Sequence, residues 1–328
     1  MSKILITGGA GFIGAHLANK LKKDNKIMIV DSLENKGGIP FIDQSNIFIK
    51  GNILEKKILN KIERWKPNII YHLAAQSGGE GAYDDPKKDY NTNGFGTYLI
   101  ANLAKKIKCK YFIYTSTVAV YGSSTKKITE NSKISPDSIY GISKYTGEMF
   151  VNQILKKTNV KVRIFRIFNT FGPGENLNNS KKGMVSIYCS YIWKKKPLII
   201  KGSLNRYRNF TYISDCVNIL AESIKNNKLN KFEIFNLSNG IKTTVKDLIK
   251  VIFKTNNIKK CKIINENNTP GDSFGYDANN LYLKKKFNNY KFLKLEEGIK
   301  KYFLWINMIK KKNLNNSHPY KINKDYKL

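Results

Sequence analysis

Three glycines at intervals of three residues, close to the start of the chain, constrain its fold more than any other feature. An apolar run at 3–7 leads directly into Gly8, Gly11 and Gly14, and helix-like spacing follows from 15 to 21. Gly8 permits a tight bend, Gly11 lets the backbone approach a pyrophosphate, and Gly14 lets the helix pack closely on the strand. The N-terminus of that helix then faces the negative charge. The pattern predicts a strand, a turn and a helix that bind a dinucleotide.

The next apolar run indicates which dinucleotide is bound. Residues 26–30 are apolar from Ile27 onward, and Asp31 follows at the end of this expected strand. A carboxylate there accepts hydrogen bonds from both ribose hydroxyls of an adenosine and repels a 2′-phosphate. The sequence therefore predicts NAD rather than NADP.

The charge of the chain favours an anionic small molecule over a nucleic acid as its partner. The 328 residues carry a formal net charge of +34, and lysines scattered over expected helix surfaces and loops supply nearly all of it. Such a Lys-, Asn- and Ile-rich composition is typical of a compositional bias rather than of a basic binding face. A positive field would still attract an anionic substrate such as a nucleotide sugar. We therefore expect no specific nucleic-acid partner.

The cysteines and the apolar runs indicate a cytoplasmic protein. Cys109, Cys189, Cys216 and Cys261 are widely spaced and form no CxxC or Cys/His cluster, so we expect reduced thiols and no metal site. A cofactor strand that begins at residue 3 leaves no room for a signal peptide, and no apolar run approaches membrane-spanning length.

Apolar runs alternate with amphipathic segments throughout the first half of the chain. The expected strands lie near 3–7, 26–30, 46–49, 68–73, 110–115 and 162–168, and helical segments lie at 54–65, 93–107 and 140–156. Such alternation builds a parallel sheet with helices on both faces. The predicted fold class is α/β, a doubly wound Rossmann sheet with a smaller, partly interleaved C-terminal substrate domain.

From about residue 170 the regular alternation of apolar and amphipathic segments ends. Residues 171–183 are loop-like, and Thr244, followed three residues later by Asp247, begins a helix. We expect the NAD-binding domain at 1–170, with returning segments near 209–238. The expected substrate domain is 171–312, mainly 171–208 and 240–312, and a polar tail follows at 313–328.

A tyrosine and a lysine four residues apart open the helical stretch at 140–156. The spacing places Tyr140 and Lys144 on one helix face, so the ammonium lies near the phenol. A neighbouring cation lowers the phenol pKa from about 10 and makes the tyrosine usable as a base near neutral pH. The strand at 110–115 leads to Thr117, whose hydroxyl we expect just past the carboxyl end of that strand, where open α/β sheets bind ligands.

With these motifs in this order, the chain resembles the extended short-chain dehydrogenase/reductase superfamily, and within it the NAD-dependent nucleotide-sugar epimerase/dehydratase family. The resemblance extends from Gly8 to about residue 300. It implies NAD as cofactor, a nucleotide-diphosphate sugar as substrate, a homodimer formed through two helices of each subunit, and Thr117, Tyr140 and Lys144 as catalytic residues. The implied cofactor contacts are Gly8, Gly11, Phe12, Ile13, Gly14, Asp31, Asn52, Ile53, Leu73, Ala74, Ala75, Gln76, Asn93, Ser116, Tyr140, Lys144 and Phe168. The implied substrate contacts are Thr117, Tyr140, Asn169, Arg206, Arg208 and Asp272.

Two positions depart from the pattern of that family. Asn52 stands where the family usually has an aspartate facing the adenine, although an amide can still accept and donate. Thr269 stands where the family usually has an arginine, three residues before Asp272. Arg206 or a loop lysine would then replace one phosphate contact, and simple turn chemistry is the alternative for Asp272.

Two further features have alternative interpretations. His72 resembles part of the cofactor-lining segment, but we expect a strand-end histidine satisfied by backbone rather than a catalytic group. The glycine-rich segment 77–86 predicts a mobile loop over the site, in which Glu80 or Tyr83 could reach a sugar hydroxyl; a plain flexible loop is the alternative.

The residues beside Thr117 discriminate between the reactions of the family. Dehydratases carry an acidic pair directly after the threonine, where this chain has Val118 and Ala119. Family decarboxylases place a glutamate near this point and 3,5-epimerases a cysteine, and Asp31 opposes the NADPH-dependent reductases. A 4-epimerase needs only the residues present, so inversion at C4 through a transient 4-keto sugar is the predicted reaction. Another enzyme of this group, such as a 4,6-dehydratase, a 2-epimerase, a reductase or a dehydrogenase, and a non-catalytic NAD-binding sensor remain as alternatives.

Overall fold

The computed structural model describes residues 1–34, 43, 45–124, 126–179, 181, 183–267 and 273–311. The strands are β1 (Ser2–Thr7), β2 (Asn25–Asp31), β3 (Ile47–Lys50), β4 (Ile69–His72), β5 (Tyr111–Thr117), β6 (Lys161–Ile167), β7 (Asn169–Phe171), β8 (Leu198–Lys201), β9 (Tyr207–Arg208), β10 (Phe210–Tyr212), β11 (Phe232–Leu237), β12 (Thr243–Thr244) and β13 (Ile263–Glu266). The helices are α1 (Phe12–Leu21), α2 (Lys56–Trp65), α3 (Gly79–Asp84), α4 (Pro86–Tyr90), α5 (Gly96–Lys106), α6 (Ile139–Leu155), α7 (Met184–Trp193), α8 (Ile213–Glu222), α9 (Val245–Thr255), α10 (Leu281–Lys286) and α11 (Leu295–Lys311). Short 3-10 turns, η1 (Lys22–Asp24) and η3 (Val118–Tyr121), and a π-helical turn, η2 (Asn91–Phe95), complete the described elements.

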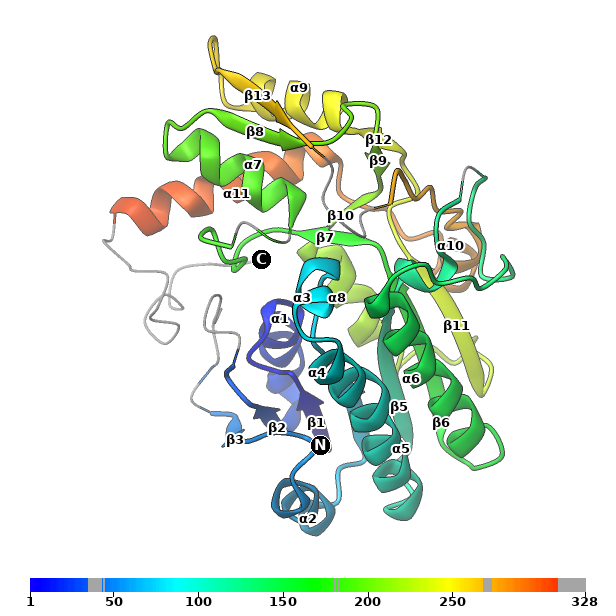
Figure 1. The fold of residues 1–328 in the computed structure, drawn as a ribbon. Helices are drawn as coiled ribbons and strands as arrows, with labels where there is room; N and C mark the ends of the chain where they lie inside the picture. The colour runs from blue at the N-terminus through cyan, green and yellow to red at the C-terminus, as the bar shows by residue number, and fades with distance from the viewer. Residues whose placement is uncertain are drawn as a thin grey trace.

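Seven parallel strands form the central sheet, in the order β11-β6-β5-β4-β1-β2-β3 (Figure 1). The chain builds outward from β1 to β3 on one side and then returns to build β4, β5, β6 and β11 on the other. The strand order therefore reverses between β1 and β4, and open sheets of this kind bind ligands beyond the carboxyl ends of the strands at such a reversal. The predicted Rossmann sheet is confirmed, with β11 as a strand beyond those expected.

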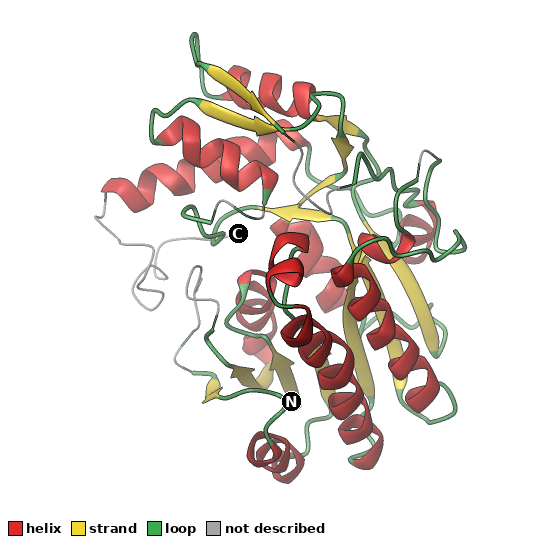
Figure 2. Ribbon diagram, in the orientation of Figure 1, coloured by secondary structure: helices red, strands yellow, loops and turns green. Residues whose placement is uncertain are grey.

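Both faces of the sheet are covered by helices, which explains why its strands are almost continuously apolar (Figure 2). Side chains alternate between two core clusters along each strand. On β5, Tyr111 and Ile113 join the cluster that contains α1 and α8 residues, whereas Phe112 and Tyr114 join the cluster formed with α2, α5 and α6. The catalytic candidates at the end of β5 are thus carried by a strand buried on both sides.

A second group of elements lies beyond the carboxyl ends of the sheet, in the upper part of Figure 1. Helices α7, α9 and α11 accompany the parallel pair β8 and β13. Their apolar side chains, among them Leu248 and Trp305, belong to the same core cluster as α1 and β1. The two groups of elements therefore share one continuous core, and the candidate site residues lie where they meet.

Several expected elements differ in detail from those observed. The expected helix at 93–107 begins as the π-helical turn η2, and regular α-helix starts only at Gly96. The predicted start of α9 is found: the Thr244 hydroxyl accepts a hydrogen bond from Asp247 N at 3.0 Å. The polar tail at 313–328 lies outside the described residues. Among the described residues, no helix is both long enough and apolar enough to span a membrane.

Candidate active site

The glycine turn between β1 and α1 is packed so tightly that side chains are excluded. Gly8 has φ +68°, and a Cβ there would lie 2.6 Å from Ala74 N. A Cβ at Gly14 would lie 2.4 Å from Gly8 O. Gly11 precedes α1 without a side-chain cap, so the first N–H groups of the helix, from Phe12 onward, can bind an anion. The turn therefore fits the pyrophosphate of a dinucleotide.

Asp31 at the end of β2 contacts the glycine turn directly. Its Oδ2 accepts from Ala10 N at 3.0 Å, and its Oδ1 accepts from Leu33 N at 2.9 Å. Burial raises the pKa of this carboxyl, and the two backbone hydrogen bonds oppose the shift. Because a carboxylate offers about four lone-pair sites, the predicted ribose contact and the support of the turn are compatible.

Asn52 and Ile53 follow β3 in the turn that leads to α2. Asn52 Oδ1 accepts from Leu54 N at 3.0 Å, and its Nδ2 donates to Glu34 Oε1 at 3.4 Å. The Ile53 side chain is buried in the core cluster beneath α2 and α5. Any cofactor contact of Ile53 is therefore a backbone contact.

His72 at the end of β4 is held by hydroxyls, not by the backbone groups that the sequence suggested. Its Nδ1 lies 2.7 Å from Thr7 Oγ1, and its Nε2 lies 2.9 Å from Thr97 Oγ1. Thr97 donates its own proton to Asn93 O at 2.6 Å, so His72 donates from Nε2 and Thr7 donates to Nδ1. Burial and the charge of Lys144 lower the His72 pKa to about 3. The neutral ring has a structural role: it links the strands β1 and β4 to η2 and α5.

Thr117, Tyr140 and Lys144 meet where β5 and α6 adjoin. Thr117 is the last residue of β5, and its Oγ1 accepts from Ala119 N at 3.2 Å. Ser138 caps α6 by accepting from Gly141 N at 3.1 Å, which places Tyr140 in the first turn of that helix. The phenol of Tyr140 interacts with the Thr117 hydroxyl. The fold therefore places Tyr140, which the sequence pattern singled out, beside the hydroxyl of Thr117.

The electrostatics of this cluster differ from the prediction. Burial raises the pKa of Tyr140 to about 12, and the hydrogen bond with Thr117 opposes the shift. Burial also lowers the pKa of Lys144 to about 7. Lys144 Nζ lies 4.3 Å from the centroid of the Tyr114 ring. The expected lowering of the tyrosine pKa is therefore wrong for the structure without ligands, because desolvation of the buried phenol outweighs its hydrogen bond with Thr117.

A buried ion pair behind the catalytic cluster escaped the sequence analysis. Arg166 Nη2 lies 2.7 Å from Glu148 Oε2, and both side chains are almost fully buried. The Ser116 hydroxyl, a predicted cofactor contact, donates to Glu148, and Arg166 Nη1 donates to the Tyr121 hydroxyl at 2.8 Å. The available signal was helical spacing, since Glu148 follows Tyr140 and Lys144 by eight and four residues on the same face of α6.

A second buried carboxylate was also missed. Asp89 of α4 is fully buried, and its Oδ1 accepts from Asn93 Nδ2 at 3.1 Å. The Ser143 hydroxyl donates to Asp89 Oδ2, and Asn93 Nδ2 also contacts Ser143 Oγ at 3.0 Å and Gln76 O at 3.0 Å. Asn93 Oδ1 is buried and has no partner among the described residues. The predicted contact Asn93 thus keeps an acceptor for a bound ligand.

Two predicted contacts follow β6. Phe168 is buried in a small apolar cluster that includes Val120 and Tyr276. Asn169 begins β7, pairs in register with Phe210 of β10 and is only partly buried. Both lie where the sheet passes into the upper group of elements.

The two predicted phosphate-binding arginines are buried and bound to backbone carbonyls. Arg208 Nη2 donates to Ser273 O at 2.8 Å, and its Nη1 donates to Phe274 O at 3.2 Å. Arg206 Nη2 donates to Lys201 O. Arg206 is buried, so it is not a solvated loop residue.

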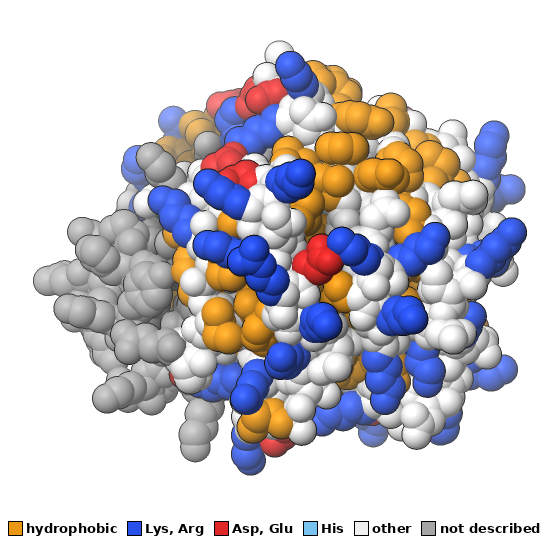
Figure 3. Space-filling model, turned by 90° about the horizontal axis from the view of Figure 1, so that it is seen from below, with side chains coloured by type: hydrophobic (Ala, Val, Ile, Leu, Met, Phe, Trp, Pro, Cys, Tyr) orange, Lys and Arg blue, Asp and Glu red, His pale blue; other side chains and the backbone are white. Residues whose placement is uncertain are grey.

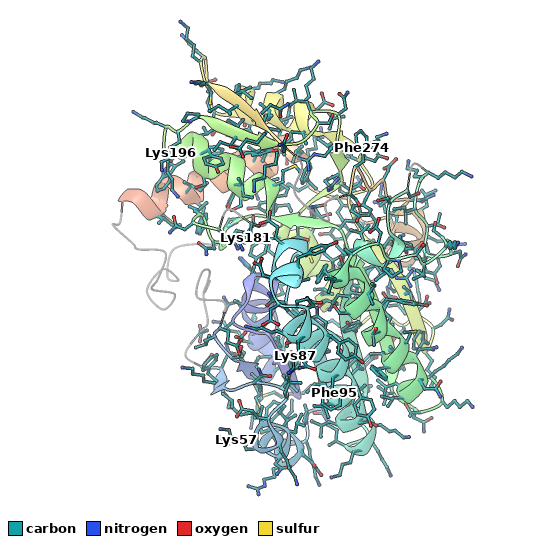
Figure 4. The ribbon with its side chains drawn as sticks, in the orientation of Figure 1. Lys57, Lys87, Phe95, Lys181, Lys196 and Phe274 are labelled. Atoms are coloured by element: carbon teal, nitrogen blue, oxygen red, sulfur yellow. The ribbon has the colours of Figure 1, made fainter. Side chains whose placement is uncertain are left out.

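The glycine-rich segment 77–86 is not the loop that was predicted. Residues 79–84 form α3, which packs against α6, and α4 follows directly. Two ion pairs join α3 to the upper elements: Glu80 to Lys201 at 3.8 Å and Asp84 to Lys181 at 2.6 Å. Figure 4 shows Lys181 beside α3. Tyr83 is 44% exposed.

The remaining predictions concern a metal and the turn at 269–272. No group of three or more His, Cys, Asp or Glu side chains among the described residues could hold a metal ion. Thr269 and Asp272 lie outside the described residues, so the substrate contact of Asp272 stays a prediction.

Comparison with known proteins agrees with this geometry. A family model described as the NAD dependent epimerase/dehydratase family matches residues 4–238. A protein of Methanocaldococcus jannaschii described as a candidate UDP-glucose 4-epimerase is 32% identical over 254 residues, which cover 76% of this chain and 81% of that protein. A dTDP-D-glucose 4,6-dehydratase of Dictyostelium discoideum is 30% identical over 273 residues, which cover 77% of this chain and 62% of that protein.

A solved structure extends the likeness over almost the whole chain. The UDP-glucose 4-epimerase of Thermotoga maritima, solved with UDP-glucose, superposes with a TM-score of 0.87 at 27% identity. The match covers 95% of this chain and 100% of that one. The relatives thus include both epimerases and a dehydratase.

Proposed function

Because this chain belongs to the NAD dependent epimerase/dehydratase family, we propose that it is a nucleotide-sugar epimerase that inverts C4 of its substrate. Membership confirms the predicted cofactor, NAD, which the glycine turn and the free Asn93 Oδ1 fit. The observation that carries the proposed reaction is the site next to Thr117. Val118 and Ala119, which follow it in η3, have hydrocarbon side chains, so neither adds an acid or base to the threonine, tyrosine and lysine.

The mechanism follows from the placement of these three residues. Tyr140, as a phenolate, removes the proton of the sugar 4-hydroxyl, and the Thr117 hydroxyl donates a hydrogen bond to that oxygen. When bound, NAD would supply a reversible hydride acceptor for C4, which inversion needs because the hydride must leave one face of the sugar carbon and come back to the other. Lys144 binds the nicotinamide ribose and stabilises the phenolate, and Tyr140 finally returns the proton. The cofactor ends unchanged, so no second redox substrate is needed.

Held in this way, the cofactor would contact the residues of the glycine turn and of the strand ends. We assign to it Gly8, Gly11, Phe12, Ile13, Gly14, Asp31, Asn52, Ile53, Leu73, Ala74, Ala75, Gln76, Asn93, Ser116, Tyr140, Lys144 and Phe168. The support is positional: most of them lie at the carboxyl ends of β1, β2, β4, β5 and β6 or in the turns that follow.

The substrate class proposed is a nucleotide-diphosphate sugar, held chiefly by the buried arginines. Arg208 and Arg206 stand on and before β9, beyond the end of the sheet, and a guanidinium can donate two parallel hydrogen bonds to phosphate oxygens. Asn169 and Asp272 complete the proposed contacts. Uridine diphosphate is the nucleotide carried by the substrates named for two of the relatives.

A homodimer formed through α5 and α6 is supported by exposed apolar side chains. Ile142 and Met149, seven residues apart on α6, are 53% and 48% exposed, and Phe95 and Tyr98 are 45% and 37% exposed at the start of α5. Phe95 and Tyr98 stack with ring centroids 5.7 Å apart. Figure 4 shows Phe95 on the α5 side of the molecule, and Figure 3 shows apolar patches between the surface lysines. Light scattering of Met149→Lys against wild type tests this assembly: the variant should be monomeric.

A cytoplasmic location is proposed from the thiols. Cys109, Cys189, Cys216 and Cys261 are all free, and burial raises the pKa of Cys109 to about 12. Protonated, buried thiols are typical of proteins kept in a reducing compartment.

The proposed reaction is tested by incubating the protein with UDP-, GDP-, CDP- and dTDP-sugars and following the sugar protons by NMR, with Tyr140→Phe as the control. Inversion at C4 of one sugar by wild type alone supports the proposal and identifies the substrate. Inversion at C2, a 4-keto-6-deoxy product or accumulating NADH would replace it with one of the other reactions of the family. No change in any sugar would favour a non-catalytic NAD-binding protein.

A further inference from the structure

Of the two carboxylates that interact with Lys144, Asp89 is the one that forms no ion pair with another described residue. Lys144 has two carboxylates in its surroundings, Glu148 of α6 and Asp89 of α4. Glu148 is already paired with Arg166 at 2.7 Å. Asp89 has no ion pair with any described residue, and both of its oxygens accept from neutral groups, Ser143 and Asn93. A buried charge needs a counter-charge, and Lys144 is the ammonium that can supply it.

The groups around Lys144 leave its ammonium without a direct partner. Apart from the carboxylates, it faces the Tyr114 ring of β5 and the neutral His72 of β4. The Lys144 ammonium makes no hydrogen bond or ion pair within the described part of the chain, although only 2% of the residue's surface is exposed. Glu148 and Asp89 both favour its charged form, and of the two only Asp89 has no cationic partner elsewhere among the described residues.

Asp89 also determines how the Asn93 amide is oriented. An ionised carboxylate only accepts hydrogen bonds, so the Asn93 amide must turn its NH₂ group toward Asp89 Oδ1. Gln76 O, a second acceptor, contacts the same NH₂ group at 3.0 Å. The Asn93 Oδ1 atom is then directed away from these acceptors and is left buried without a partner, as an acceptor for a donor of the ligand.

We propose that Asp89 is a positioning residue of the active site, which fixes the Asn93 amide through direct and Ser143-mediated hydrogen bonds and balances the charge of Lys144. The inference rests on the proposed function, because it assumes that NAD binds beside Asn93 and Lys144. Asp89 touches neither the cofactor nor the sugar: it acts through Asn93, Ser143 and Lys144.

Two variants separate the charge from the geometry. Asp89→Asn removes the charge and keeps a side chain that can accept from Asn93 and donate to Ser143. Ser143→Ala keeps the charge and removes the link between Asp89 and α6. Asp85→Asn is the matched control, because it removes the same charge from an exposed position on α4, where asparagine still caps the helix.

The first measurement is kcat/KM against pH. A negative charge near the Tyr140 and Lys144 pair stabilises the protonated pair, so its loss makes deprotonation easier. Asp89→Asn should therefore move the acid limb of the profile to lower pH by about one unit, as expected for one nearby charge. Asp85→Asn and Ser143→Ala should leave the limb at its wild-type position. A limb that stays in place in Asp89→Asn overturns the role of the charge.

The second measurement is the affinity of the cofactor-free protein for NAD, by calorimetry across the same pH range and without any sugar. Ser143→Ala should bind NAD about tenfold more weakly, because one orienting hydrogen bond to a polar group is lost. Wild-type affinity in that variant overturns the orienting role. If the melting curve shows that Asp89→Asn does not fold, Ser143→Ala still tests the orienting role. The pH profile of Asp89→Glu then tests the role of the charge, and its acid limb should lie at the wild-type position because the charge is kept.

These measurements also distinguish failure of the inference from failure of the proposed function. If wild type binds NAD but converts no sugar, the proposed epimerase is wrong. The pH dependence of NAD affinity is then measured in place of that of kcat/KM, because affinity should fall as Lys144 loses its proton. The midpoint of this fall should lie at lower pH in Asp89→Asn than in Asp85→Asn. Coincident curves for the two variants overturn the inference.

Discussion

The two halves of the site hold their polar groups in different ways. In the cofactor half, polar side chains are hydrogen-bonded to one another inside the core, and the bonds that join Thr7, His72 and Thr97 are an example. This half comprises residues 7–14, 72–76, 89–97, 114–117 and 140–148. In the substrate half, residues 79–84, 181, 201–208 and 273–276, Arg208 is bonded to loop carbonyls and two ion pairs are partly exposed. The first half is organised by the sheet, whereas the second depends on loops that connect separate elements.

This difference has a consequence for what each half can tolerate. A buried hydrogen-bonded network loses much when one member is removed, because the remaining partners stay buried and unsatisfied. Exposed ion pairs contribute little and are screened by salt. Substitutions in the cofactor half should therefore have large effects that salt does not change, and those in the outer substrate half should have small effects that salt abolishes.

The largest effect is expected for Tyr140→Phe. Removing the only proposed base should lower kcat by about 10²–10⁴-fold, the usual contribution of general-base catalysis. The phenyl ring keeps the packing, so NAD affinity should change little. Steady-state kinetics of the epimerisation and calorimetry with NAD give the two values. Residual activity close to wild type would show that the proton is taken by another group.

A large effect on cofactor binding is expected for Gly14→Ala. The new Cβ would lie 2.4 Å from Gly8 O and 2.7 Å from Gly9 Cα, so the backbone of the turn must move. A moved backbone would lose hydrogen bonds to the pyrophosphate, each contributing about 1.5–3 kcal/mol, so we expect NAD affinity to fall about 100-fold together with a lower melting temperature.

Gly11→Ala is the informative comparison for that variant. The nearest atom to its Cβ is Gly8 O at 3.2 Å, so the fold should melt nearly as wild type does. NAD affinity should nevertheless fall, because the pyrophosphate must approach the backbone at this position. Unchanged affinity in Gly11→Ala would place the phosphates elsewhere.

The sequence predicted the first half of the site well because its information is local. The glycine turn, Asp31 and the spacing of Tyr140 and Lys144 each lie within one strand, turn or helix. The balance of charge around Lys144 is not local, since Asp89 comes from a different helix and meets α6 only through packing. For the same reason the predicted direction of the Tyr140 pKa shift was wrong, because the spacing of Tyr140 and Lys144 does not show how far the phenol is desolvated by packing.

The substrate half was less predictable for a related reason. The helix α3 forms from a segment with three glycines, which local propensity assigns to a loop. It packs against α6 and is joined to the upper elements by Glu80 and Asp84. The burial of Arg206 and Arg208 likewise depends on carbonyls brought from other segments. Tertiary contacts, rather than motifs, determine this half.

An intermediate effect, on stability, is expected for Lys144→Met. The pKa of Lys144 is lowered to about 7 in the folded protein, whereas an unfolded lysine titrates at about 10.4. Between these values the unfolded chain binds more protons, so this group destabilises the fold increasingly as pH falls toward 7. Because Lys144→Met alone would leave the Asp89 charge buried without a counter-charge, the comparison is Lys144→Met/Asp89→Asn against Asp89→Asn. In that pair methionine should raise the free energy of unfolding of the cofactor-free protein by about 1–4 kcal/mol near neutral pH and by less near pH 10. Urea unfolding at both pH values measures this. A destabilised variant would show that the ammonium is better compensated than the contacts indicate.

The smallest effect is expected for Glu80→Gln, which removes one ion pair of the substrate half. Glu80 lies 3.8 Å from Lys201, and these side chains are 22% and 46% exposed. Such a pair contributes about 0.2–1 kcal/mol, so KM for the nucleotide sugar should rise no more than about fivefold at low salt. At an ionic strength of about 1 M the Debye length is about 3 Å, and this screening should remove the difference in KM from wild type. If the KM effect instead persists undiminished in high salt, Glu80 contacts the sugar itself, and the contrast between the two halves of the site does not extend to α3.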